Sequence, residues 1–411
     1  MRRISSLIKA HRVGIWFSVS QTGLSLTQMT GYLISCRFIL PEDMGIWQTA
    51  MLVNIYAGFF NLGILSGLGR EFPYLMGKNK RVKAIEYSAT ALVHMLFVSV
   101  ILMLCFVCFT FWHWSHGVNW RMGGGAMSLT APLLVLCGYY KCLYRSGNEF
   151  SKLAWLFVGL SFLNLLTILF PWFFGFRGFL GRELLLSFVQ LAMLHFNCPI
   201  HKLDKPSWAC WRELFDVGWR IYINSYIVQI IWALPRTMLR LLGSTALLGS
   251  YAPVNWMFSG LRTLTAGVSM YVYPQLTYRF ASTGKPVKRI AALASLLMML
   301  FFAPVIIFGV LLLPWAIKTC LPNYIQAVTA CQISLVAAWL EVFFVTNLSL
   351  ATQKRWCAMY TQLAFHFVIR LACCMGGFFL MRDKLTGIAC GNLAASMCMI
   401  PVVFVTIFRS D

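Results

Sequence analysis

Long apolar runs separated by short polar loops dominate this chain, and stretches such as SLLMMLFFAPVIIFGVLLLP contain no charge at all. A helix needs about 20 apolar residues to cross a bilayer. Strands of a membrane barrel alternate apolar and polar positions instead, so unbroken runs favour helices. The pattern predicts twelve spans, at about residues 13–38, 46–68, 88–112, 127–144, 153–172, 178–197, 219–241, 247–273, 290–315, 326–350, 357–380 and 386–408.

Basic residues gather in alternate loops, beginning with Arg2 and Arg3 before the first span. The loop after that span carries Glu42 and Asp43, and no basic residue lies beside them. Short loops that lie in the cytoplasm carry an excess of Lys and Arg. We therefore expect a multi-pass protein of the bacterial inner membrane with both termini in the cytoplasm. The N-terminal segment lacks a small-residue cleavage site, so we interpret it as part of a retained first helix.

Composition agrees with this class: 59% of residues are apolar, 11% are charged and the mean hydropathy is +0.73. The net charge of +22 does not indicate nucleic-acid binding, because the basic residues occupy short loops between spans. Fourteen cysteines are scattered mostly within apolar runs, which favours packing over a metal site.

The longest polar stretch predicts a division into an N-terminal six-helix bundle (1–198), a cytoplasmic linker (199–218) and a C-terminal six-helix bundle (219–411). The two halves also share a pattern. Gly45 corresponds to Gly249, Trp47 to Tyr251, Pro73 to Pro274, and Gly77-Lys78 to Gly284-Lys285. The alternative is a chance coincidence in apolar sequence. We expect an all-α integral membrane fold with two parallel six-helix repeats around a central cleft.

Charged residues deep in apolar spans are the main candidates for function, because each costs at least about 2.5–3.5 kcal/mol to insert. Arg262 and Arg370 fall near the middle of the eighth and eleventh spans, and Glu341 is the only acidic residue expected at equal depth. Glu341 can pair with Arg370 on the following span. Arg262 then either faces an anionic ligand or is satisfied by backbone carbonyls.

Further basic residues flank these spans. Arg236 and Arg240 follow Pro235 at the outer end of the seventh span, where they either bind a ligand or extend to the membrane surface. Arg37 lies at the outer end of the first span. Lys141 and Arg145 lie at the inner end of the fourth, as an entrance for phosphates or as an ordinary topogenic pair. We expect no catalytic and no metal-binding residues.

The segments ILPEDMGIWQTAML, LGILSGLGREFPYL, PRTMLRLLGSTALLGSYAPVNWM and YVYPQLTYRF resemble polysaccharide (Wzx-type O-antigen) flippases of the multidrug/oligosaccharidyl-lipid/polysaccharide exporter superfamily. Pro235 stands where that family usually has Asp, whereas Arg236 keeps the following Arg. The resemblance implies transport of undecaprenyl-diphosphate-linked oligosaccharide, such as an O-antigen repeat unit, from the cytoplasmic to the periplasmic leaflet by alternating access.

Guanidinium groups hold phosphate oxygens well, so the candidates for pyrophosphate and glycan contacts are Arg262, Arg370, Arg236, Arg240 and Arg37. Glu341 is the candidate for coupling to a H⁺ or Na⁺ gradient, with the membrane potential as a second driving force. No cofactor is expected. Expected partners are the lipid-linked glycan, membrane lipids and other polysaccharide-assembly membrane proteins, with no nucleic acid, and the chain is expected to be a monomer.

Two alternatives stay open at this point. One is an ion-coupled multidrug exporter of the same superfamily, which would need acidic residues to hold cationic substrates. The other is a membrane-bound O-antigen polymerase or acyltransferase. The sequence has no P-loop and no nucleophile elbow, and its outer loops are short, so we expect a transporter and not an enzyme.

Overall fold

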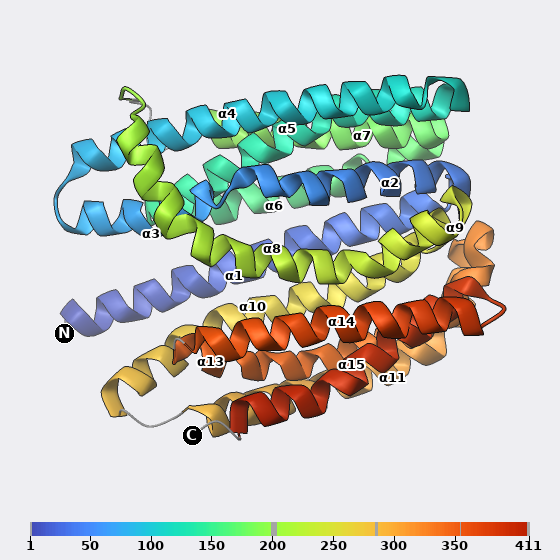
Figure 1. The fold of residues 1–411 in the computed structure, drawn as a ribbon. Helices are drawn as coiled ribbons and strands as arrows, with labels where there is room; N and C mark the ends of the chain where they lie inside the picture. Colours follow the sequence, from blue (N-terminus) through green and yellow to red (C-terminus); the bar gives the residue numbers. More distant parts are fainter. Residues whose placement is uncertain (1, 199–203, 284–286, 354, 409–411) are drawn as a thin grey trace. The chain divides into compact units, whose positions relative to one another are not determined.

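The computed structural model describes residues 2–198, 204–283, 287–353 and 355–408, and every regular element in these ranges is a helix. Most elements are α-helices (Figure 1), and short 3₁₀-helices (η) lie between some of them. They are α1 (Arg2–Cys36), α2 (Pro41–Ala57), η1 (Gly58–Asn61), α3 (Ile64–Gly77), α4 (Arg81–Trp112), η2 (Trp114–His116), α5 (Val118–Ser146), α6 (Phe150–Leu166), α7 (Leu169–Phe196), α8 (Trp208–Leu242), α9 (Thr245–Ser250), α10 (Ala252–Thr283), α11 (Lys288–Cys320), η3 (Pro322–Ala327), α12 (Val328–Glu341), η4 (Val342–Asn347), α13 (Leu348–Thr352), α14 (Trp356–Leu380) and α15 (Lys384–Phe408).

Each of the predicted spans falls on one or two of the α-helices, and spans 46–68 and 326–350 also include 3₁₀-helices. Seven helical segments among the described residues are long and apolar enough to cross a membrane, or eight if the bent pair formed by Pro41–Asn61 and Ile64–Gly77 is one span. That pair bends by 49°. Many large apolar side chains point outward; Phe301, for example, is 74% exposed. The protein is therefore an α-helical multi-pass membrane protein.

The chain forms two compact units. Unit 1 contains Met1–Gly31 and Ala50–Gln229, and unit 2 contains Tyr32–Thr49 and Ile230–Asp411. Helices α1, α2 and α8 therefore each contribute residues to both units. The predicted domains, with boundaries at 198 and 219, did not include this sharing of helices.

Unit 1 has its core between α3, α4 and α5, with α7 packed on α5. Figure 1 shows α4, α5 and α7 running side by side. Leu68, Phe72 and Tyr139 are among its fully buried side chains. The turn expected between the fifth and sixth spans lies at Gly175, whose φ of 54° interrupts the helical backbone inside α7.

The expected linker 199–218 is helical from Trp208 onward, whereas residues 199–203 lie outside the described part. This start of α8 belongs to unit 1. Cys210 and Leu214 are buried in the unit 1 core, and Trp211 Nε1 donates to His94 Nδ1 at 3.2 Å. Lys83 Nζ lies 3.0 Å from Glu213 Oε2. The segment is thus packed onto α3 and α4 and is not a free connection.

Unit 2 is built around α12, which packs against α10, α11 and α15, while α14 lies along α15. Small residues permit that last contact: a Cβ on Gly377 would strike the backbone of Gly387, and one on Gly391 would strike the backbone of Cys373. Close approach through small residues is a common way for membrane helices to associate. This packing brings the charged residues of α12 and α14 together.

Candidate functional site

Arg370 and Glu341 form a completely enclosed ion pair in unit 2. Arg370 Nη2 donates to Glu341 Oε1, and the side chains are 0% and 4% exposed. Ser396 Oγ, on α15, lies 3.5 Å from both Arg370 Nη2 and Glu341 Oε1. The predicted pairing of these two residues is confirmed. Arg370 is enclosed by protein, and its charge is balanced by Glu341. It can therefore bind another molecule only if this ion pair opens.

Arg262, on α10, stacks its guanidinium against the indole ring of Trp232 on α8, with the Phe258 ring 5.9 Å away. Trp232 is half-buried, and its Nε1 has no hydrogen-bond partner among the described residues. Stacking on an aromatic face stabilises a cation without neutralising it. The charges of Glu341, Arg370 and Arg236 all act on Arg262. Arg262 therefore stays a cation within the field of a single carboxylate that already has a partner.

Arg236, on α8, is half-buried like Arg262. Its Nη1 lies 3.4 Å from Oε1 of Gln48, a side chain that is 1% exposed. Gln48 belongs to the short piece of α2 that is part of unit 2, so this contact is internal to the unit. Arg240 lies one turn further along α8 and is also half-buried. Four buried or half-buried arginines and Glu341 thus belong to unit 2.

The remaining predicted site residues lie at the surface or near it. Arg37 is exposed, and its Nη1 is 3.3 Å from the carbonyl oxygen of Thr319. Lys141 is half-buried in unit 1, and Arg145 is exposed with its Nε donating to the Lys141 carbonyl at 3.3 Å. The described contacts of these three residues do not join them to the arginines of unit 2.

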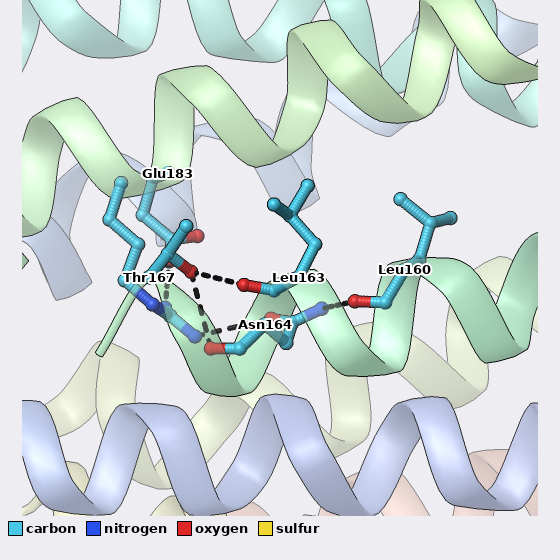
Figure 2. Close-up of polar contacts among 6 residues, drawn as sticks. Leu160, Leu163, Asn164, Thr167 and Glu183 are labelled. Atoms are coloured by element: carbon cyan, nitrogen blue, oxygen red, sulfur yellow. Dashed lines mark hydrogen bonds and ion pairs between the residues drawn. The ribbon is translucent and has the colours of Figure 1, made fainter. Parts of the chain in front are cut away.

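Sequence reasoning missed a second buried ion pair, in unit 1 (Figure 2). Arg182 is 0% exposed, with Nη1 2.5 Å from Glu183 Oε1 and Nη2 3.1 Å from Asn164 Oδ1. Arg182 and Glu183 fall within the sixth predicted span, but neither was among the candidate site residues. An Arg-Glu dipeptide next to an apolar run, with Asn164 on the preceding span, was the available signal.

The chemistry available in unit 2 is anion binding. Guanidinium groups offer several donors in a planar fork that matches phosphate oxygens. Glu341 is the one acid among these side chains, and it is paired with Arg370. A cationic ligand would meet net repulsion here.

No family profile and no curated protein matches the sequence. Solved structures do match over nearly the whole chain. The lipid II flippase MurJ in an inward closed conformation is 11% identical, covers 96% of this chain and 87% of its own, and has a TM-score of 0.67. An inward-facing multidrug resistance MATE family transporter of the MOP superfamily is 13% identical, covers 95% and 98%, and has a TM-score of 0.66.

A MATE transporter from Vibrio cholerae is 14% identical, covers 100% of this chain and 99% of its own, and has a TM-score of 0.64. These three proteins are transporters and not enzymes. At such low identity the likeness concerns the fold alone. The chain has the fold of the MOP-superfamily transporters.

Proposed function

We propose that this protein is a flippase that moves undecaprenyl-diphosphate-linked oligosaccharide from the cytoplasmic to the periplasmic leaflet of a bacterial inner membrane. It has twelve spans in two parallel six-helix repeats, both termini in the cytoplasm, and a central cleft that opens alternately to either side. The fold supports a transport function, and the lipid II flippase among the solved structures is one member that moves a lipid substrate.

One observation carries the substrate class: in unit 2, Glu341 already pairs with Arg370, whereas the described contacts of Arg262 are with the aromatic rings of Trp232 and Phe258. The positive charge of Arg262 is therefore the one that an anionic ligand would meet. A diphosphate carries the complementary charge, and its sugars suit neighbouring amides and indoles such as Gln48 and Trp232. The prenyl chain can stay in the bilayer.

Arg262 and Arg236 are the primary diphosphate contacts in this proposal, and Arg240 and Arg37 extend the cationic surface towards the outer side. Arg370 joins them only when its pair with Glu341 opens. Lys141 and Arg145 attract phosphates at the inner entrance. Glu341 couples transport to a H⁺ or Na⁺ gradient, and the inside-negative potential adds about 2.3 kcal/mol per charge and 100 mV for an anion moving outward.

A multidrug exporter is the second candidate, because most of the similar solved structures are MATE transporters. The excess of buried arginines argues against it, since a cationic drug needs unpaired carboxylates. A polymerase or acyltransferase has no support from the similar structures, which are transporters.

The decisive experiment uses proteoliposomes that contain a fluorescent undecaprenyl-diphosphate oligosaccharide in both leaflets. An impermeant quencher measures how fast the label exchanges between the leaflets. We expect exchange with the wild-type chain and a large loss with the Arg262→Ala/Arg236→Ala variant. Exchange no faster than in empty liposomes, together with ethidium efflux from the same preparation, would favour the drug exporter instead.

A further inference from the structure

One face of α14 carries a polar stripe that the transport proposal does not use. Gln362, His366 and Arg370 are spaced four residues apart and are all buried, with Cys374 and Phe378 continuing the same row. Side chains at this spacing lie next to one another on a helix, with about 5–6 Å between their Cβ atoms. The stripe therefore leads from the start of α14 to the Arg370–Glu341 pair.

Several polar atoms along this stripe have no hydrogen-bond partner within the described part of the chain: Nε and Nη1 of Arg370, Nε2 of His366 and Oε1 of Gln362. On α15, Asn392 Oδ1 also lacks a hydrogen-bond partner among the described residues. Asn392 lies one helical turn from Ser396, whose Oγ is 3.5 Å from both members of the ion pair. These side chains are between 0% and 8% exposed. Leaving so many buried groups unsatisfied would cost about 1–3 kcal/mol each.

The chemistry of these groups identifies what satisfies them. Arg370 offers unused donors, whereas Gln362 and Asn392 offer unused acceptors. An anion would satisfy only the donors, and a metal cation would be repelled by Arg370. Water donates and accepts, and buried water typically makes about three hydrogen bonds to polar groups of this kind.

We propose that Gln362, His366, Arg370 and Asn392 line a hydrated polar file in unit 2 that gives water, and through it protons, access to Glu341. The inference deepens the ion-coupling part of the proposed function and selects the proton as the coupling ion. A proton that reaches Glu341 forms an O–H bond on its carboxylate and breaks the ion pair, which releases Arg370 for an anionic ligand.

The surroundings of His366 contain few competing charges. The Phe344 ring lies against it at 5.3 Å. Arg370, on its own helix, is the nearest charge, and α13 carries no titratable residue. The other titratable residues on α14, on α15 and on α12, which carries Glu341, are Cys331, Glu341, Cys357, Tyr360, Cys373, Cys374, Lys384, Cys390 and Cys398. Lys384 opens α15 at the end that meets the end of α14, so it lies far along the helix from His366.

His94 in unit 1 provides a matched internal control. It is 9% exposed against 8% for His366. Both of its ring nitrogens have partners, however: Nε2 lies 3.2 Å from the Phe60 carbonyl oxygen and Nδ1 accepts from Trp211 Nε1. The two histidines therefore have nearly equal exposure but differ in the hydrogen bonding of Nε2.

The first test is exchange of the imidazole C2 hydrogen in D₂O, followed by mass spectrometry of the full-length chain in nanodiscs. This exchange requires water and hydroxide at the ring. We expect His366 to exchange several-fold faster than His94 while the backbone amides of α14 stay protected. Equal rates, or a slower rate at His366, would overturn the hydrated file.

The second test follows the protonated carboxyl band of Glu341 by infrared spectroscopy after a rapid drop in pH, with Glu341→Gln as the variant that lacks the band. His366→Phe should slow the appearance of the band several-fold, whereas His366→Gln, which still binds water, should leave it nearly unchanged. An unchanged rate in His366→Phe, or no band at any pH, would contradict proton access. Neither test involves the cargo, so each is separate from the test of glycan transport.

Discussion

Gly45 and Gly249 pack backbone against backbone where the start of α2 meets α9 in unit 2. A Cβ placed on Gly249 would lie 2.6 Å from the amide nitrogen of Gly45 and still closer to the carbonyl oxygen of Pro41. A Cβ on Gly45 would strike the Thr245 carbonyl. These are the two glycines that the internal sequence repeat pairs with each other. Their shared function is to let two short helical segments meet without any intervening side chain.

Gly249→Ala should destabilise unit 2, because the added methyl group meets backbone atoms that have no freedom to rotate away. We expect a loss of about 1–3 kcal/mol, typical of overpacking. Gly376→Ala on α14 is the matched control, since nothing lies within 4 Å of a Cβ there. It should be neutral or stabilise the helix by about 0.5–1 kcal/mol. Unfolding in mixed detergent–SDS micelles measures both, and equal effects would contradict the close contact.

The Arg370–Glu341 pair makes a second prediction, through a double-mutant cycle. Glu341→Gln alone leaves a buried guanidinium without a counter-charge and should cost about 3–5 kcal/mol. Adding Arg370→Met should restore most of that loss, because the remaining site is apolar and uncharged. The surface pair Lys152–Glu149, whose side chains are 56% and 35% exposed, is the control: Lys152→Gln should cost about 0–1 kcal/mol. Additive single effects in the cycle would show that the pair is not coupled.

The helices could be located from sequence because most predicted ranges are long apolar runs. Every predicted range falls on helical residues, and seven or eight of the described segments are long and apolar enough to cross a membrane. The Arg370–Glu341 pair was also predictable, since two opposite charges in consecutive apolar spans have few other partners. In both cases the deciding property is local. Burial in a membrane protein penalises an isolated charge so strongly that position along the span is informative by itself.

Other features depend on packing that the sequence does not display. Arg182 falls near the start of the sixth predicted span, where a basic residue can extend to the membrane surface, yet it is 0% exposed and contacts Asn164 on α6. The start of α8 contains charged residues, and its sequence therefore predicted a linker. Its burial arises from a close fit to α3: a Cβ on Gly67 would strike the Leu214 carbonyl. Such contacts between distant segments cannot be inferred from the composition of either segment.

The buried cluster around Arg182 leads to the third prediction. Asn164→Leu keeps the volume of the side chain but removes the acceptor that lies 3.1 Å from Arg182 Nη2. The unfolding free energy should fall by about 1.5–3 kcal/mol, the value of a hydrogen bond to a charged group. Asn197→Ala removes an exposed amide that bonds only to the Met193 carbonyl among the described residues, and should change stability by less than about 0.5 kcal/mol. Similar losses in both variants would contradict the structural role of Asn164.

Arg262 gives the sharpest test of ligand chemistry, because the chain contains a second Arg–Trp stack in a different setting. Arg121 lies over Trp114 at 4.4 Å, and its Nε donates to the Trp114 carbonyl at 2.8 Å. Both arginines stack on indole, but only Arg262 shares its field with Arg236, Arg370 and Glu341. A role that depends on stacking alone predicts equal effects of the two substitutions, whereas anion binding predicts an effect at Arg262 only.

Arg262→Ala should therefore weaken binding of undecaprenyl diphosphate by about 1.5–3 kcal/mol, the value of one hydrogen bond to a charged group. That corresponds to roughly 10–100-fold in Kd. Arg262→Lys should fall between Ala and wild type, because it keeps the charge and loses the planar fork. Arg121→Ala should bind like wild type. Scintillation proximity binding with the radiolabelled lipid on purified protein measures all three, and wild-type affinity in Arg262→Ala would remove this arginine from the site.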